Sequence, residues 1–174
     1  IEKRLCTLKS IPAESAEQQK LQSFLQEKFI PSFTEIMQEC TLKMAKANLS
    51  LSIPIAAEER TLSPSDFGFH NALRKTDGKI VFLDFEYFGW DDPAKTISDF
   101  LFHPGMELSE ELQKKFLQNI LLFFNQHNFK EKLEITYPLF GLIWCLLILN
   151  EFIPDNLQQR QFAHKDLAKK EILA

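Results

Sequence analysis

The sequence predicts a mainly helical α+β fold. Three observations indicate it: two capping-box patterns within the first 40 residues, an apolar stripe at helical spacing, and a Ser-, Pro- and Gly-rich stretch followed by a hairpin signal. We therefore expect helices, an ordered loop, a small hairpin and then further helices, within a single domain that spans residues 1–174.

Helices are expected before residue 60. Ser15-x-x-Gln18 and Ser32-x-x-Glu35 have the pattern in which a hydroxyl and an amide or carboxylate satisfy the free N–H groups of a helix start. The second predicted helix carries apolar residues three and four positions apart, typical of one buried helical face. These residues are Phe33, Ile36, Met37, Cys40 and Met44.

An ordered loop and a hairpin follow. Residues 62–71, with the sequence LSPSDFGFHN, are too rich in Ser, Pro and Gly for a helix interior. The extended segments 72–74 and 79–85 flank Asp77-Gly78, a pair that suits the positive φ angles of a tight turn.

The pattern is helical again from Pro93, which suits a first helical turn, and Ser109 is a candidate cap of the next helix. A strongly apolar helix is expected over 137–149. Pro154 and Asp155 then open a polar final helix.

Composition argues against several classes of protein. The net charge of −4 arises from 20 basic and 24 acidic residues spread along the chain, so no basic surface for nucleic acid is expected. The apolar run 139–149 is shorter than the roughly 20 residues of a membrane span and is interpreted as a buried core helix.

The cysteines indicate a reducing compartment, and the start of the chain indicates a fragment. Cys6, Cys40 and Cys145 are odd in number and far apart, so they predict no disulfide framework and no zinc site, and we expect a cytoplasmic protein. The first residues, IEKRL, show no signal-peptide order and no initiator Met, so we expect a fragment.

The candidate chemical centre consists of Asp66, Asn71 and Asp84. Phosphoryl transfer needs a carboxylate that accepts the proton of the attacking hydroxyl and oxygen ligands that hold Mg²⁺. Asp66-x-x-x-x-Asn71 has the spacing of a kinase catalytic loop, and Asp84 ends the second predicted strand. The alternatives are an ordinary pair of turn residues and a solvated strand end. Because Asp84 lies between Leu83 and Phe85, however, we expect it in a dry environment that requires a partner or a metal.

These residues resemble the phosphotransferase family that includes the aminoglycoside and choline kinases. The resemblance covers residues 62–101 and rests on Ser65-Asp66 through Asn71, on LDFEY at 83–87, on Asp92-Pro93 and on Asp99-Phe100. It implies the C-terminal lobe of a protein-kinase-like fold, with a hairpin after the catalytic loop. It further implies that Asp66 is the catalytic base, that Asn71 and Asp84 bind Mg²⁺, that ATP is the phosphate donor, and that Asp99 anchors the backbone of the catalytic loop.

Two features depart from that family. Pro64 stands where the family commonly has His, two residues before the catalytic Asp, so the loop needs other contacts, such as the hydroxyls of Ser63 or Ser65. A simple turn role for Ser65 is the favoured alternative. The nucleotide-covering lobe, with its Gly-rich hairpin and strand-borne Lys, is not visible in the sequence. We therefore predict that an N-terminal lobe of about 100 residues is missing and that the isolated chain has little activity.

Other residues near the candidate centre are weaker candidates. All four histidines (His70, His103, His127 and His164) are interpreted as surface or structural residues, and only His70 neighbours the site. His70, Glu86 and Trp90 are candidate contacts for substrate or phosphate, although packing is the favoured role for Trp90 and its neighbours Tyr87 and Phe88. Asp91 and Asp92 are interpreted as favourable charges at a helix start.

The leading hypothesis is an ATP- and Mg²⁺-dependent small-molecule kinase that acts on an aminoglycoside, choline, ethanolamine or sugar-like hydroxyl. The alternative is a catalytically impaired relative that serves as a binding or regulatory module. A purely structural helical domain is the third hypothesis. No nucleic-acid partner and no membrane are expected.

Overall fold

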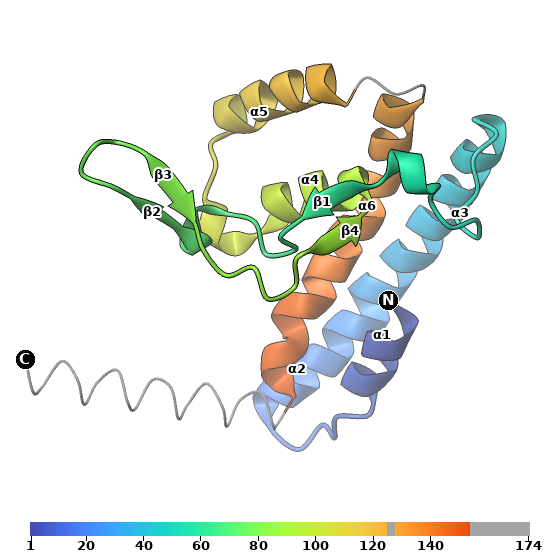
Figure 1. Cartoon of the computed structure of the whole chain (residues 1–174). Helices are drawn as coiled ribbons and strands as arrows, with labels where there is room; N and C mark the ends of the chain where they lie inside the picture. Colours follow the sequence, from blue (N-terminus) through green and yellow to red (C-terminus); the bar gives the residue numbers. More distant parts are fainter. Residues whose placement is uncertain (125–127, 154–174) are drawn as a thin grey trace, which may run out of the picture. The chain divides into compact units, whose positions relative to one another are not determined.

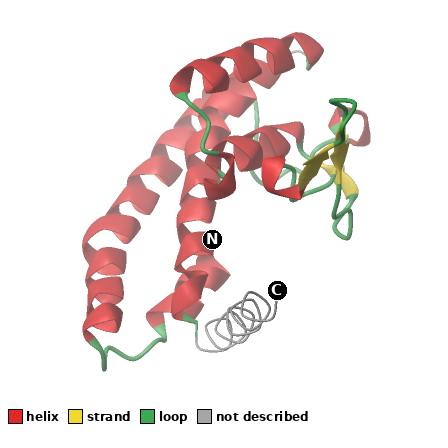
Figure 2. Cartoon of the chain, turned by 90° about the vertical axis from the view of Figure 1, so that its left-hand side faces the viewer, coloured by secondary structure: helices red, strands yellow, loops and turns green. Residues whose placement is uncertain are grey.

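The computed structural model describes residues 1–124 and 128–153 (Figure 1). Helices dominate these residues, and the strands form two short antiparallel pairs (Figure 2). The mainly helical α+β class is therefore confirmed. The described chain forms two compact units, one of residues 1–34 with 145–153 and the other of residues 35–144. The single domain expected over 1–174 stays a prediction.

The first unit contains α1 (Glu2–Lys9), α2 (Ala16–Phe24) and a short 3-10 helix (Leu149–Phe152). Ser15 caps α2 as predicted, because its side chain accepts from the backbone N–H of Gln18 and the Gln18 side chain accepts from the backbone N–H of Ser15. The Gln22 side chain donates to the carbonyls of Leu8 and Ile11, which ties α2 to the end of α1. Leu8, Leu21, Leu25 and Phe29 are buried in its core.

The predicted helix start at Ser32 is wrong. A π-helical segment (Leu25–Phe29) joins α2 directly to α3 (Ile30–Lys46), so Ser32 lies inside a continuous helix. Pro31 explains the irregularity, because proline has no N–H and its ring would clash with the carbonyl four residues earlier. The Ile30 N–H instead donates to the Leu25 carbonyl, five residues back.

The second unit holds the predicted apolar stripe from Ile36 onward, together with α4, α5 and most of α6. Cys40 and Met44 of α3 are buried with Ile135 of α6 (Phe129–Ile148), and the Cys40 thiol donates to the Ile135 carbonyl at 3.0 Å. Ala94 and Ile97 of α4 (Pro93–Phe102) are buried with residues of α6, and side chains of α5 (Glu110–Phe123) pack against this core. Pro93 is at the first turn of α4 and Ser109 caps α5, both as predicted.

Two antiparallel pairs of strands complete this unit. β2 (Ala72–Arg74) pairs with β3 (Ile80–Phe82), and Gly78 has a φ of 86° in their turn, so the predicted hairpin is confirmed. β3 ends at Phe82 rather than at residue 85. The sequence did not indicate the second pair, β1 (Thr61–Ser63) with β4 (Gly89–Asp91), because three-residue strands leave almost no alternating pattern to detect.

The apolar C-terminal helix is longer than the sequence run suggested. The helical stretch Phe129–Phe152 has 24 residues and, among the described residues, is the one helix long and apolar enough to cross a membrane by length and composition. Core helices of water-soluble proteins, which are mostly buried, pass the same test. This helix is only partly buried: 28% of its most apolar stretch is buried, and Leu142 and Leu146 are the buried residues of the run 139–149 that was predicted to be a core helix. The polar helix predicted from Pro154, and also His127 and His164, lie outside the described residues.

Candidate functional site

Asp66 projects from a tight turn centred on Ser65. Ser65 has a φ of 63°, and the Asp66 N–H donates to the Pro64 carbonyl at 2.8 Å, the two-residue hydrogen bond of a γ-turn. Such a conformation is strained for a residue with a side chain, so the surrounding contacts must hold it in place. The Ser63 hydroxyl accepts from the Ser65 N–H, and the Ser65 hydroxyl donates to the Tyr87 carbonyl at 3.0 Å. The hydroxyls of Ser63 and Ser65 therefore support the loop that contains Pro64, as expected. Ser65 is not only a turn residue, because its side chain also bonds to the backbone of Tyr87.

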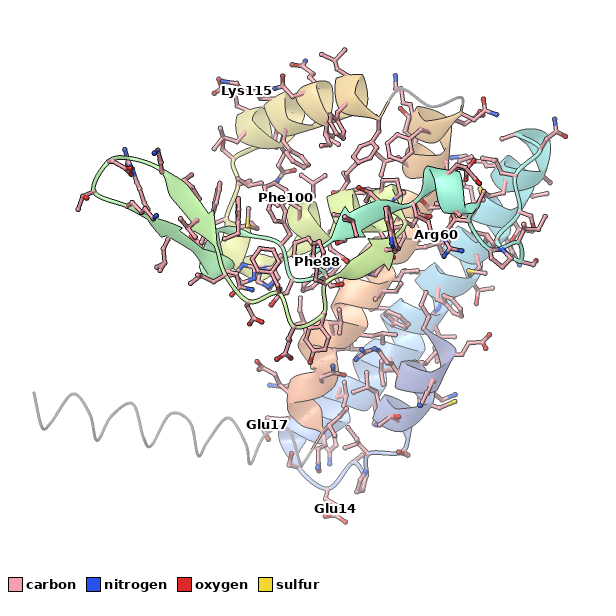
Figure 3. The ribbon with its side chains drawn as sticks, in the orientation of Figure 1. Glu14, Glu17, Arg60, Phe88, Phe100 and Lys115 are labelled. Atoms are coloured by element: carbon pink, nitrogen blue, oxygen red, sulfur yellow. The ribbon has the colours of Figure 1, made fainter. Side chains whose placement is uncertain are left out.

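The loop that follows Asp66 is fixed by aromatic packing. The ring of Phe67 lies 4.8 Å from that of Phe82 on β3 and 5.3 Å from that of Phe100 on α4. Phe100, which is labelled in Figure 3, also stacks on Phe116 of α5 with ring centroids 4.3 Å apart. The backbone beside Asp66 is therefore attached both to the hairpin and to the helical core.

Two side chains lie within hydrogen-bond distance of the Asp66 carboxylate. The Asn71 amide nitrogen donates to Oδ2 at 3.1 Å and to the Asp66 carbonyl at 2.9 Å, while His70 Nε2 lies 3.0 Å from Oδ1. The Asp66 side chain remains 47% exposed. The structure therefore brings together three of the predicted site residues, with the carboxylate still open to solvent.

Asp84 lies next to Asn71 through the backbone. The Leu83 N–H donates to the Asn71 carbonyl at 2.8 Å, which extends the pairing of β2 and β3 by one step. Asp84 has a φ of 59°, in the left-handed region that residues with side chains rarely adopt. The expectation of a dry environment is wrong, because Asp84 is exposed and its neighbours Leu83 and Phe85 are 43% and 51% exposed.

Asp99 does not bond to the loop backbone. Its Oδ1 accepts from the indole N–H of Trp144 at 2.9 Å, and its Oδ2 accepts from Lys95 at 2.9 Å. The predicted role as a direct anchor of the catalytic loop is therefore wrong within the described residues. The Asp99 side chain is linked to His103 through Trp144, which packs edge-on against the His103 ring at 5.1 Å, and the Asp99 carbonyl accepts from the His103 N–H at 3.0 Å.

His103 is the site residue that the sequence did not indicate. Its ring stacks on that of His70 with centroids 3.8 Å apart and an angle of 6° between the planes, and its Nε2 lies 3.7 Å from Asp66 Oδ1. The prediction that, of the histidines, only His70 neighbours the site is thus wrong. The two rings meet because the turn Pro104–Met106 lies against the turn Phe69–Asn71, where the Phe69 N–H donates to the sulfur of Met106 at 3.1 Å.

The electrostatics of the histidine pair favour a neutral His103. Burial lowers the pKa of His103, and the charge of His70 lowers it further, against the opposing effects of Asp66 and Asp99. The Gly105 N–H donates to His103 Nδ1 at 3.0 Å. An accepting nitrogen carries no proton, so the proton of the neutral ring is at Nε2, on the side that faces Asp66.

The aromatic residues after Asp84 are exposed. Tyr87, Phe88 and Trp90 are 68%, 50% and 66% exposed, so their favoured interpretation as core-packing residues is wrong. Phe88 is labelled in Figure 3, and Trp90 lies opposite Leu62 in the pairing of β1 with β4. The Tyr87 pKa is raised, first by its hydrogen bond with Glu86, then by the charge of Glu86, with further contributions from desolvation and Asp84. Glu86 is exposed as well.

The acidic residues before α4 have structural partners. Asp92 caps α4 by accepting from the Ala94 N–H and pairs with Lys132 at 2.8 Å, while Asp91 pairs with Lys95 at 2.8 Å. Burial tends to lower the pKa of Lys95, but its hydrogen bonds to Asp91 and Asp99 outweigh that effect and leave the pKa raised. The structural interpretation of Asp91 and Asp92 is confirmed.

The chain matches no family model, no curated protein and no solved structure. Any functional conclusion therefore depends on the residues of the site itself.

Proposed function

We propose that this chain is the catalytic and acceptor-binding lobe of an ATP- and Mg²⁺-dependent phosphotransferase that acts on a hydroxyl of a small molecule. In this proposal, Asp66 is the base and Asn71 and Asp84 are the metal ligands. The C-terminal lobe of a protein-kinase-like fold is the proposed architecture, and an N-terminal lobe of the same protein binds the nucleotide. The cysteines, which are all free, are consistent with the cytoplasm as the proposed location.

The observation that carries the proposal is the half-exposed Asp66 carboxylate on its strained turn, oriented by Asn71. Each carboxylate oxygen has two acceptor positions. Asn71 occupies one position of Oδ2 and His70 one position of Oδ1, so the outward positions can still receive the proton of an acceptor hydroxyl.

The donor groups of Asn71 and Asp84 suit Mg²⁺. Because the Asn71 amide nitrogen faces Asp66, its amide oxygen faces away, and that oxygen has no hydrogen-bond partner among the described residues. The Asp84 carboxylate is exposed and likewise has no hydrogen bond among residues 1–124 and 128–153. Amide and carboxylate oxygens are the ligands that Mg²⁺ prefers, and a bound Mg²⁺ would neutralise phosphate charge.

A catalytically impaired binding module is the second candidate. His70 already occupies one acceptor position of Asp66, and Pro64 stands where the resembled kinases carry His. A protein that retained the site for binding alone would still bind metal and nucleotide but would transfer no phosphate.

The first experiment measures metal binding by the 174-residue chain. Under the proposal, Mg²⁺ or Mn²⁺ raises its melting temperature, and Asp84→Asn abolishes the shift because binding stabilises only a chain that has the site. Asp77→Asn is the matched control, since Asp77 is a half-exposed carboxylate on the same hairpin whose partner is Lys79. A shift that survives Asp84→Asn, or no shift at all, contradicts the assignment of Asp84.

The second experiment measures ATP consumption by the full-length parent protein across a panel of small hydroxyl compounds. Turnover that depends on an acceptor and disappears in Asp66→Ala supports the kinase. ATP binding without turnover on any acceptor favours the impaired module.

A further inference from the structure

The Asp66 carboxylate lies in a cluster with His70 and His103, two side chains to which the proposed function assigns no role. The ligand atoms of the three residues lie within 4.8 Å of one another, with both histidine Nε2 atoms near the same Asp66 oxygen. The two imidazoles are only 24% and 21% exposed. Such a cluster either binds a transition metal ion or orients the carboxylate by hydrogen bonding.

The hydrogen bond from Gly105 distinguishes these alternatives. A metal ion at His103 Nε2 needs a lone pair there, so the ring would carry its proton on Nδ1. The Gly105 N–H already points at Nδ1 from 3.0 Å, and a second hydrogen there would oppose it. The structure therefore favours a ring that presents Nε2–H to Asp66 over a ring that binds metal.

His103 reaches Asp66 mainly through His70. Its own Nε2 is 3.7 Å from Asp66 Oδ1, which is longer than a hydrogen bond, whereas His70 Nε2 is within hydrogen-bond distance at 3.0 Å. The stacked His103 ring limits the plane that the His70 ring can adopt. His103 is in turn held by Trp144, whose indole N–H is bonded to Asp99.

We propose that His103 is a positioning residue: held by Gly105 and Trp144, it fixes the His70 ring and thereby the orientation of the Asp66 carboxylate. The placement of the three side chains is independent of the reaction, and only the consequence for catalysis rests on the proposed function, in which Asp66 is the base. A base displaced by even a fraction of an ångström transfers protons less efficiently, so the loss is expected in kcat.

The placement is tested by NMR of the imidazole nitrogens in the 174-residue chain. The expected result is a His103 ring with Nδ1 unprotonated and Nε2 protonated, unchanged by Zn²⁺, and a His70 ring whose signals shift in His103→Phe. That variant keeps a ring against His70 and Trp144 but has no nitrogen. A proton on His103 Nδ1 overturns the proposal in favour of a metal site. So does a stabilisation of the chain by Zn²⁺ that is absent in His103→Phe.

The consequence is tested by kinetics of the full-length parent protein. We expect His103→Ala, which removes the stacked ring, to lower kcat about 10-fold with little change in the KM for ATP, and His103→Phe, which keeps a ring against His70 and Trp144, to recover most of that loss. Equal losses in both variants, or no loss in either, overturn the positioning role. A parent protein that turns over no acceptor refutes the proposed function instead, and the NMR result still decides where His103 lies.

Discussion

Gly68→Ala should disrupt the site directly, because His70 lies over the Gly68 backbone. A Cβ added at Gly68 would be 2.5 Å from His70 Cε1, 2.6 Å from His70 Nδ1 and 2.7 Å from the sulfur of Met106. Ordinary contacts begin at 3.4 Å. The His70 ring therefore has to move by about 1 Å, which is enough to break its 3.0 Å hydrogen bond to Asp66.

The energetic cost follows from two opposing effects. Overpacking a filled site costs about 1–3 kcal/mol, whereas Gly→Ala at an ordinary φ returns about 0.4–1 kcal/mol by restricting the unfolded chain. Gly68 has an extended φ of 178°, so no backbone strain is added. We expect a net loss of about 1–2 kcal/mol in the free energy of unfolding.

Urea unfolding measures this loss, and Gly89→Ala is the matched control. A Cβ at Gly89 meets nothing within 4 Å, so that variant should be close to neutral. In a His70→Ala background the cost of Gly68→Ala should shrink, because the two nearest atoms, both in the His70 ring, are then absent. If Gly68→Ala is as stable as the unsubstituted chain and the His70 NMR signals do not move, the described placement of His70 is refuted.

Three further predictions concern the cap of α2, the support of His103 and the pH dependence. Ser15→Ala should lower the free energy of unfolding by about 1 kcal/mol, because the hydrogen bond from the Gln18 N–H is lost. Ser15→Asn keeps a capping oxygen and should not lower it. Equal losses for the two variants in urea unfolding would contradict the cap. Trp144→Phe should lower the free energy of unfolding by about 1–3 kcal/mol, because the Asp99 carboxylate, which is only 15% exposed, loses the indole N–H that donates to it at 2.9 Å. An unchanged stability in calorimetry would contradict this hydrogen bond. The pKa of His103 is lowered from 6.5, so the unfolded chain binds more protons below that value. Stability should therefore fall as pH drops below about 6.5, and His103→Phe should reduce this fall; an identical pH profile in that variant would refute the assignment.

The sequence accounted for those parts of the fold that depend on neighbouring residues. Ser15, Ser109 and Pro93 act at helix starts through groups within three positions along the chain, and Gly78 sets the hairpin turn through its own φ angle. Local signals of this kind can be read without a fold. Ser32 shows their limit, because the same capping pattern is overridden when the preceding segment is already helical.

The candidate site likewise contains residues that local spacing predicts and contacts that only tertiary packing creates. The spacing of Asp66 and Asn71 is local, and the sequence by itself was sufficient to single them out with Asp84. Only the tertiary structure brought His103 onto His70 and directed Asp99 to Trp144, 45 residues away. The exposure of Asp84 and of the aromatic residues after it was also decided in three dimensions, because burial depends on which segments pack together, and no spacing along the chain records that.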